Sequence, residues 1–362
     1  MRKLHLIAIS ILLSSIGLSQ EFSDSKAIKK QRKRFLKVAP YAYIPSGTLM
    51  VGQTDGDVYN FNANRARTCN IKSFYMMKYE VSNIDYLTYV QEIRKTDTLL
   101  AKSIYPDTLV WRTGNGFNQA YEEYYLRHPA YRDYPLVGIS YNDAVAFAKW
   151  LTAEYDKRID KEFKKVKFRL PTEEEWEYAA RGGDPSAIYP WSHYSARNED
   201  GDCMANFLYF SQHSIYRDSS WGSRIVIAKD HNSTMDSIKR PYYRLVNLGM
   251  SPGNYMGVAG SLNDNADVTA PVGAYWPNGY GLYNMAGNVE EMVDAYYDRD
   301  PFSDELHDLM PSRAEDPSGI TRGGSWDDPG YNVTVSARQF YSGKEYSSRE
   351  MGFRLVMEVI DY

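Results

Sequence analysis

Cysteine is scarce in this sequence: Cys69 and Cys203 are the only two among 362 residues. The sequence does not fix the distance between them, so a disulfide and two free thiols stay open as alternatives. Histidine is scarce as well, and no two of the six are spaced as neighbours on one helical face. A metal centre of clustered histidines is therefore not expected.

Long hydrophobic runs are also rare, and the one that stands out lies at the N-terminus. Residues 4–18 are largely apolar, follow a basic start and are followed by a small residue. The run falls short of the roughly 20 residues that a membrane span needs. Residues 1–19 are therefore interpreted as a signal peptide cleaved before Gln20, with a membrane anchor as the alternative. Because no cysteine follows the run, we expect an exported protein without a lipid anchor, periplasmic or associated with the outer membrane.

Net charge is small, with a formal value of −4 at pH 7. Such a balance argues against nucleic acid as the main partner, because no basic surplus neutralises phosphates. Positive charge gathers in a polar arm, residues 20–38, whose basic residues are Lys26, Lys29, Lys30, Arg32, Lys33, Arg34 and Lys37. The arm is interpreted as a solvated linker, with peripheral contact to an anionic membrane surface or an acidic partner as the alternative.

The rest of the chain, residues 39–362, reads as one domain rich in tyrosine and turn-forming residues. Three helix starts are predicted by a capping residue followed three positions later by an acidic one: Ser82 with Asp85, Ser140 with Asp143, and Thr172 with Glu175. Short strands are predicted within 43–52, around a Pro-Ser-Gly turn, and at 352–356. Residues 183–270 show little periodicity. These patterns predict an α+β, loop-rich fold with little regular secondary structure.

Short motifs follow one another along this domain in a characteristic order. They are Ile44-Pro45-Ser46-Gly47 and Met50-Val51-Gly52; Phe74-Tyr75 and Glu80-Val81-Ser82-Asn83; residues 135–140; residues 168–177; Pro190-Trp191; Ala205-Asn206; Ala270-Pro271-Val272; residues 278–291; residues 322–326; and Gly352-Phe353-Arg354. Together they resemble the sulfatase-modifying factor family, whose founding member is the formylglycine-generating enzyme. The resemblance runs from about residue 43 to 356. It implies that family's loop-rich fold, which is similar to C-type-lectin-like domains.

An insert at about residues 105–134 resembles a narrower group within that family, the gliding-motility and type IX secretion lipoproteins of the J and K kinds. The founding enzyme has no such insert, and this chain departs from the group by lacking its lipid-bearing cysteine. The insert is rich in Tyr, Trp and Arg, the residues that most often anchor protein interfaces. It therefore predicts envelope protein partners, contacted through Trp111, Tyr124, Tyr125 and Tyr131. Packing of these rings onto the domain as an ordinary cover is the alternative.

The family's oxygen-dependent enzymes need two reactive cysteines just after the Arg-Gly-Gly-Ser stretch, where thiolates bind copper. Residues 326–340 of this chain contain no cysteine, and Cys69 and Cys203 lie outside every matching motif. Copper is therefore not expected as a cofactor and no catalytic residue is assigned. The chain is predicted to be a pseudoenzyme of the family.

Calcium is the cofactor that the resemblance implies, in a structural role. The ligands carried over to this chain are Asn284, Gly287, Val289 and Glu291 for one site, and Asn206, Phe207, Asp264 and Ala266 for a second. Side-chain oxygens and backbone carbonyls are the ligands that hard cations prefer. The alternative for Asn284 and Asn288 is that their side chains satisfy the backbone of a turn.

Three functions compete on this basis. The main hypothesis is a non-catalytic, structural component of a gliding-motility or type IX secretion apparatus in the cell envelope. The second is an exported ligand-binding module of C-type-lectin-like fold, which a pocket lined by exposed aromatic rings would favour. The third is an enzyme with an unrecorded active site, which convergent carboxyl groups of perturbed pKa would favour.

Overall fold

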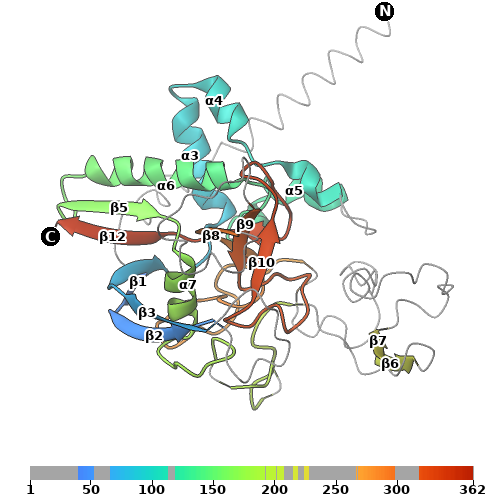
Figure 1. The fold of residues 1–362 in the computed structure, drawn as a ribbon. Helices are drawn as coiled ribbons and strands as arrows, with labels where there is room; N and C mark the ends of the chain where they lie inside the picture. Colours follow the sequence, from blue (N-terminus) through green and yellow to red (C-terminus); the bar gives the residue numbers. More distant parts are fainter. Residues whose placement is uncertain are drawn as a thin grey trace, which may run out of the picture.

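Two four-stranded sheets, with helices packed on them, form the framework of the protein (Figure 1). The computed structural model describes residues 40–52, 66–112, 119–191, 193–200, 202–207, 215–218, 224–227, 266, 268–297 and 318–361. The predicted signal peptide and basic arm lie outside these residues. None of the helices within them has the length and apolar character that a membrane crossing requires.

The first sheet is antiparallel and joins strands from both ends of the chain. Its order is β1 (Tyr41–Ile44), β4 (Phe74–Met77), β12 (Val356–Asp361) and β5 (Lys165–Arg169). The second sheet has the order β10 (Arg338–Tyr341), β9 (Ser318–Arg322), β8 (Glu290–Tyr297) and β11 (Met351–Gly352), with β8 and β11 parallel. Two antiparallel pairs complete the strands of the described residues: β2 (Gly47–Val51) with β3 (Arg67–Ile71), and β6 (Ile215–Asp218) with β7 (Arg224–Ile227).

The three predicted helix starts are confirmed. The helices that follow them are α3 (Asn83–Arg94), α6 (Tyr141–Asp156) and α7 (Glu173–Ala180). In each, the acidic side chain three positions on accepts a hydrogen bond from the backbone N–H of the capping residue, at 3.0 Å for Ser82, 3.1 Å for Ser140 and 2.9 Å for Thr172. These bonds fix the point where each helix begins, because they engage the capping residue itself.

The apolar face of α6 packs against the first sheet. Its buried side chains are Ala144, Phe147, Ala148 and Leu151. They share the largest apolar cluster with Phe168 of β5 and Met357 of β12. Trp176 of α7 is fully buried in a second cluster, beside Met285 and Val293. The two clusters hold α6 and α7 on the strands, so the loops between α7 and β8 start from a rigid support.

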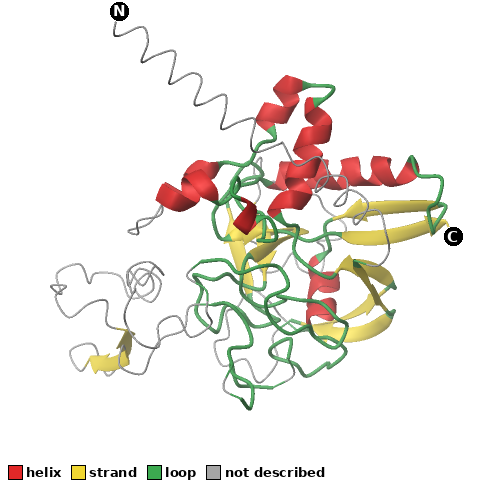
Figure 2. Cartoon of the chain, turned by 180° about the vertical axis from the view of Figure 1, so that it is seen from behind, coloured by secondary structure: helices red, strands yellow, loops and turns green. Residues whose placement is uncertain are grey.

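Loops dominate between α7 and β8, as the sequence predicts. In the described part of that stretch the only strands are β6 and β7, and Figure 2 shows the loops gathered away from the helices at the top of the view. The α+β, loop-rich class is confirmed. The C-terminal strand begins at Val356 rather than at Gly352. Residues 353–355 leave the ladder because Phe353 and Leu355 enter the core while Arg354 turns to an ion pair.

The insert folds as short helices on the body of the domain. After α4 (Thr98–Ser103), these are η1 (Thr108–Arg112), α5 (Gln119–Tyr124) and η2 (Pro129–Tyr131); residues 113–118 lie outside the described residues. The side chain that a residue other than glycine would carry at Gly138 would approach the Asp107 carbonyl oxygen to 2.3 Å. The insert is therefore in close contact with the segment that carries the Pro135 to Ser140 motif.

Two of the four predicted partner-contacting rings in this insert are part of the core. Trp111 and Tyr125 are each 2% exposed and pack with Val289 and Trp326. The prediction that Trp111 and Tyr125 contact a partner is therefore wrong, because burial keeps both rings from the surface. Tyr131 is half-buried against the same cluster. Tyr124 is 47% exposed, so it can still reach a partner.

Candidate functional site

The loop that carries the first predicted calcium set, residues 284–291, has an unusual backbone. Asn284, Gly287 and Asn288 have positive φ angles of 51°, 70° and 67°, a region in which glycine and asparagine are enriched. A side chain at Gly287 would lie 2.0 Å from the Asn206 carbonyl oxygen, and the Asn288 N–H donates to that oxygen at 2.7 Å. The structure thus brings Asn206, from the second predicted set, against the loop of the first.

A buried carboxyl group, that of Glu80, holds the asparagine side chains of this loop. Its two oxygens accept hydrogen bonds from Nδ2 of Asn284 at 3.1 Å and of Asn288 at 2.8 Å. Burial raises the pKa of Glu80 to about 8, against the opposing charge of Arg354. Asn288 also bonds in both directions to the backbone of Ala270. The Asn288 side chain thus satisfies the backbone of Ala270, 18 positions away, and not that of its own turn.

Glu291, the single carboxylate of the first set, is engaged in a buried ion pair. The Arg354 guanidinium donates to its two oxygens, from Nη2 at 2.5 Å and from Nε at 2.7 Å. The Trp176 indole N–H adds a third hydrogen bond at 2.7 Å. Arg354 also donates to the Tyr283 carbonyl oxygen at 2.8 Å. These bonds join β8, α7 and the segment between β11 and β12 at one buried point.

The first predicted set fits calcium in part. The Oδ1 atom of Asn284 is buried and has no hydrogen-bond partner, which suits an oxygen ligand of a hard cation. Glu291 does not suit one, because its oxygens are taken by Arg354, whose charge repels a metal ion. Among the described residues, no cluster of three or more His, Cys, Asp or Glu side chains is placed to hold a metal.

The second predicted set is only partly within the described residues. Asn206 donates from Nδ2 to the Val268 carbonyl oxygen at 2.7 Å, and Phe207 is buried in an apolar cluster. Ala266 is half-buried, whereas Asp264 lies outside the described residues. Among the described members, Asn206 supports the loop at 284–291, since its Nδ2 also donates to Asn288 Oδ1 at 3.3 Å.

The turn after Arg-Gly-Gly-Ser, where the family's enzymes carry cysteines, holds carboxylates in this chain. Asp328 accepts four hydrogen bonds here: from the N–H and hydroxyl of Ser325 at 2.8 and 2.7 Å, from Asn332 at 2.6 Å and from Gln339 at 2.8 Å. Cys69 lies on β3 and Cys203 is buried in a loop, both as free thiols. The two therefore form no disulfide in this structure.

A cluster of carboxyl groups lies beside this turn, and no pattern in the sequence predicts it. Burial and the charges of Asp328 and Glu350 raise the pKa of Glu290 to about 8. Burial also raises the pKa of Asp327 to about 7, against the opposing charge of Arg349. Arg349 bridges Glu350 at 2.7 Å and Asp327 at 3.2 Å. Carboxyl groups that titrate near neutral pH have the property that a general acid or base needs. The signal available in the sequence is two pairs of adjacent acidic residues, Glu290-Glu291 and Asp327-Asp328.

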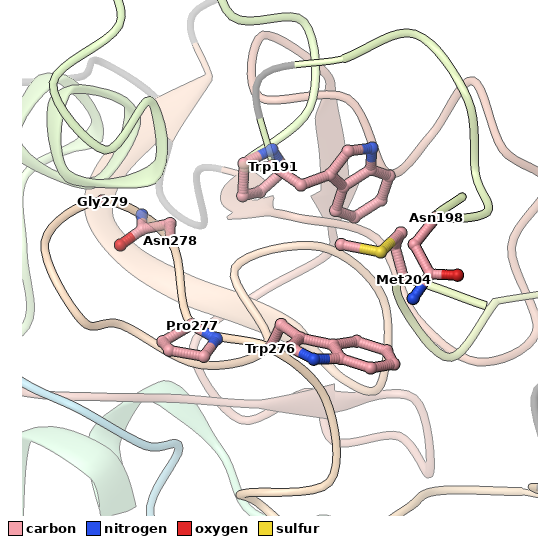
Figure 3. A pocket seen from close by; sticks show the side chains of 8 residues that line it. Trp191, Asn198, Met204, Trp276, Pro277, Asn278 and Gly279 are labelled. Atoms are coloured by element: carbon pink, nitrogen blue, oxygen red, sulfur yellow. The ribbon is translucent and has the colours of Figure 1, made fainter. Parts of the chain in front are cut away.

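A pocket of about 310 Å³ opens between two loops of the domain (Figure 3). The residues that line it are Pro190, Trp191, Asn198, Met204, Trp276, Pro277, Asn278 and Gly279. Figure 3 shows the indole rings of Trp191 and Trp276 on opposite sides, with Met204 between them in that view. Trp276 is 50% exposed. We call this the Trp191–Trp276 pocket.

Both walls of the Trp191–Trp276 pocket are held by the rest of the domain. The Trp191 ring stacks on Tyr189, with ring centroids 4.9 Å apart and planes 4° apart. On the other wall, Asn278 donates to the last carbonyls of α7, at 2.8 Å to Ala179 and 3.1 Å to Ala180. The Trp191 ring is thus preorganised for a ligand, and the loop that carries Trp276 is tied to the end of α7. The sequence motifs include Pro190-Trp191 and Asn278-Gly279 but not Trp276, and they do not predict that the two segments meet.

Comparison with known proteins gives the same family as the motifs. The chain matches the family described as sulfatase-modifying factor enzyme 1-like domain over residues 25–234 and 244–359. The formylglycine-generating enzyme of Thermomonospora curvata is 28% identical over 310 residues, 78% of this chain and 81% of that protein. The enzyme of the same name from Mus musculus is 26% identical over 274 residues, 70% of this chain, and the match spans 57% of the mouse protein.

Similarity extends to a protein without activity and to solved structures. The inactive C-alpha-formylglycine-generating enzyme 2 of Bos taurus is 22% identical over 306 residues, 79% of this chain and 75% of that protein. The structure of PvdO from Pseudomonas aeruginosa has a TM-score of 0.52 at 20% identity, covering 88% of this chain and 94% of that one, a likeness of fold alone. Because the family match takes in most of the chain, this protein belongs to the sulfatase-modifying factor family.

Proposed function

We propose that this chain is a non-catalytic member of its family and a structural component of a gliding-motility or type IX secretion apparatus in the cell envelope. The observation that carries the first part is the absence of cysteine from residues 326–340. Asp327 and Asp328 stand in the turn where the thiols are needed, and carboxylate oxygen is a poor substitute for thiolate as a soft copper ligand. The Bos taurus relative is named an inactive formylglycine-generating enzyme, which supports a family that includes members without this activity.

The purified protein is expected not to convert the cysteine of a sulfatase-derived peptide into formylglycine when copper and oxygen are supplied. The reason is that neither Cys69 nor Cys203 belongs to the turn that follows Arg-Gly-Gly-Ser. Mass spectrometry of the peptide measures the conversion, with the Thermomonospora curvata enzyme as the positive control. Conversion above the level of a protein-free sample would contradict the proposal.

A proton-transfer enzyme is the second candidate, and the raised pKa values of Glu290 and Asp327 are the observation that favours it. The bonds of the same groups favour a structural role. Glu290 accepts a hydrogen bond from the Thr321 hydroxyl at 2.6 Å, and Asp327 pairs with Arg349. Both carboxyl groups already have partners within the domain, so the non-catalytic proposal explains them without a substrate.

The envelope role rests on the resemblance of the insert to the J and K lipoproteins, and partner contact falls to the exposed Tyr124. Affinity purification of the protein from its native envelope is expected to recover envelope proteins, identified by mass spectrometry. Tyr124→Ala is expected to reduce that recovery with the melting temperature unchanged, because the ring is at the surface. Tyr194→Ala, which changes a ring 81% exposed in another loop, is the control. If the two variants recover envelope proteins equally, the insert does not take part in the interface.

We propose a structural calcium at the loop of residues 284–291, supported by the unpartnered Oδ1 of Asn284. Excess chelator is expected to lower the melting temperature, since a ligand bound by the native state alone stabilises it by mass action. Asn284→Gly is expected to abolish the difference, because glycine keeps the positive φ and removes the ligand. Glu291→Ala is expected to lower stability whether or not calcium is present, because it breaks the pair with Arg354. Equal melting of the native protein with calcium and with chelator would exclude the site.

A further inference from the structure

The Trp191–Trp276 pocket has few unsatisfied polar side-chain groups. Asn198 Oδ1 accepts a hydrogen bond from the Asp202 N–H at 2.8 Å. Asn278 Oδ1 accepts from the backbone of the same loop, and the Trp191 indole N–H donates to the Ser195 carbonyl oxygen at 2.9 Å. A sugar or another polyol would leave hydroxyl groups without partners here, which costs free energy that aromatic stacking has to offset. The lining thus disfavours a ligand that depends on many hydrogen bonds.

Charge near the pocket favours a cation. No charged side chain lines the pocket. Nδ2 of the lining residue Asn198 donates to the Asp202 carboxylate at 3.4 Å, and the exposed Glu199 and Asp200 come next after Asn198 in the chain. The basic residues of the same loop are Arg197, which is half-buried, and His193, which is exposed. Acidic side chains close to a lining residue of an uncharged pocket attract cations and repel anions.

We propose that the Trp191–Trp276 pocket binds an organic cation with a methylated ammonium group. Indole is the strongest cation–π partner among the aromatic side chains, and a cation gains most when it leaves water. A fully methylated ammonium has no N–H groups, so it needs none of the acceptors that the pocket lacks. A lysine ammonium carries three donors and would remain unsatisfied there. The proposal adds a ligand site to the non-catalytic, structural role and does not depend on it.

The size and stiffness of the pocket fit a small headgroup. Ligand pockets in proteins range over about 300–1,000 Å³, and a volume of about 310 Å³ lies at the low end of that range. Met204, which lies between the indole rings in Figure 3, is polarizable and adaptable enough to shift around an incoming group. Choline is the simplest probe of this chemistry. It occurs free and as the headgroup of a phospholipid, so the test has to separate the two sources.

The experiment titrates the whole chain with choline chloride and with 3,3-dimethylbutanol, a neutral molecule of the same shape, and follows binding by calorimetry. Choline is expected to bind at least roughly tenfold more tightly, because only the cation interacts with the indole quadrupole. Trp276→Ala is expected to weaken choline binding by roughly tenfold, and Trp276→Phe by less. Tyr194→Ala, an exposed ring that does not line the pocket, should bind as the native protein does.

The acidic residues after Asn198 are tested separately with Glu199→Gln combined with Asp200→Asn, which should weaken binding at low salt and have little effect at high salt. Vesicles of phosphatidylcholine, with phosphatidylglycerol vesicles as the control, separate the sources. Binding to the first vesicles alone identifies a lipid headgroup, and binding of free choline without vesicle binding identifies a soluble ligand. Equal affinity for the neutral molecule, no effect of Trp276→Ala in a variant that melts normally, or no binding of choline in either form would each overturn the proposal.

Discussion

Replacing Trp111 with alanine is expected to lower the free energy of unfolding by about 3–5 kcal/mol, the range for large aromatic residues in a packed core. The ring is 2% exposed. Its centroid lies 4.7 Å from that of Tyr125, 5.1 Å from Tyr121 and 6.4 Å from Trp326. Alanine leaves a cavity that rings from the insert and from the turn after Arg-Gly-Gly-Ser cannot fill without moving. Denaturant unfolding followed by circular dichroism measures the loss.

Tyr124→Ala is the matched control, because it removes an aromatic ring from the same insert at a site that is 47% exposed. Its free energy of unfolding should stay close to that of the native protein, since surface substitutions are usually within about 0.5 kcal/mol. The same reasoning predicts that replacing the whole insert by a short flexible loop unfolds the domain. If Trp111→Ala is as harmless as Tyr124→Ala, the insert is a dispensable cover and not part of the core.

Arg354→Met is expected to lower the free energy of unfolding by about 3–5 kcal/mol, the cost of leaving one member of a buried ion pair without its partner. The Glu291 carboxyl would then retain the Trp176 N–H as its side-chain partner. Glu80, whose two oxygens face Asn284 and Asn288, would lose the cation that opposes the rise of its pKa. The Tyr283 carbonyl oxygen would also lose its donor. Chemical denaturation at neutral pH measures the effect.

Two variants separate burial from charge in this prediction. Arg112→Met breaks an ion pair with Glu122 at the surface and should leave melting nearly unchanged, because exposed pairs contribute little. Arg354→Met combined with Glu291→Leu removes both charges of the buried pair and should recover part of the loss. A double variant that is less stable than Arg354→Met would show that hydrogen-bond geometry, and not the unpaired charge, holds this point together.

Local features of this chain were predictable because they depend on neighbours in sequence. The starts of α3, α6 and α7 follow from a cap and an acidic residue three positions apart, which meet within one turn of helix. The buried face of α6 follows from the period of its apolar residues. The absence of cysteine after Arg-Gly-Gly-Ser is a matter of residue type, so no coordinates are needed to state it. The order of the motifs predicted the family in the same way, since that order is a property of the amino-acid sequence alone.

Orientation of the aromatic residues was not predictable, because a tyrosine or tryptophan suits both a core and an interface. Within one short insert, Trp111 and Tyr125 turn inward and Tyr124 turns outward. Nothing in their spacing separates the two cases. The tertiary structure determines which rings are buried. Trp326 and Val289, from distant parts of the chain, provide the apolar surface on which Trp111 and Tyr125 pack.

The sequence by itself determined the helix starts, the loop-rich α+β class and the absence of cysteine after Arg-Gly-Gly-Ser, all of which rest on adjacent residues or residue types. Tertiary structure alone decided which segments meet. It sends β1 and β2, separated by two residues, to different strand partners, and it pairs Glu291 with Arg354 across 63 positions. It also sets Trp191 opposite Trp276. Contacts between residues far apart in the sequence depend on how the layers of the domain pack. They produce no periodic pattern in the sequence, so the sequence does not predict them.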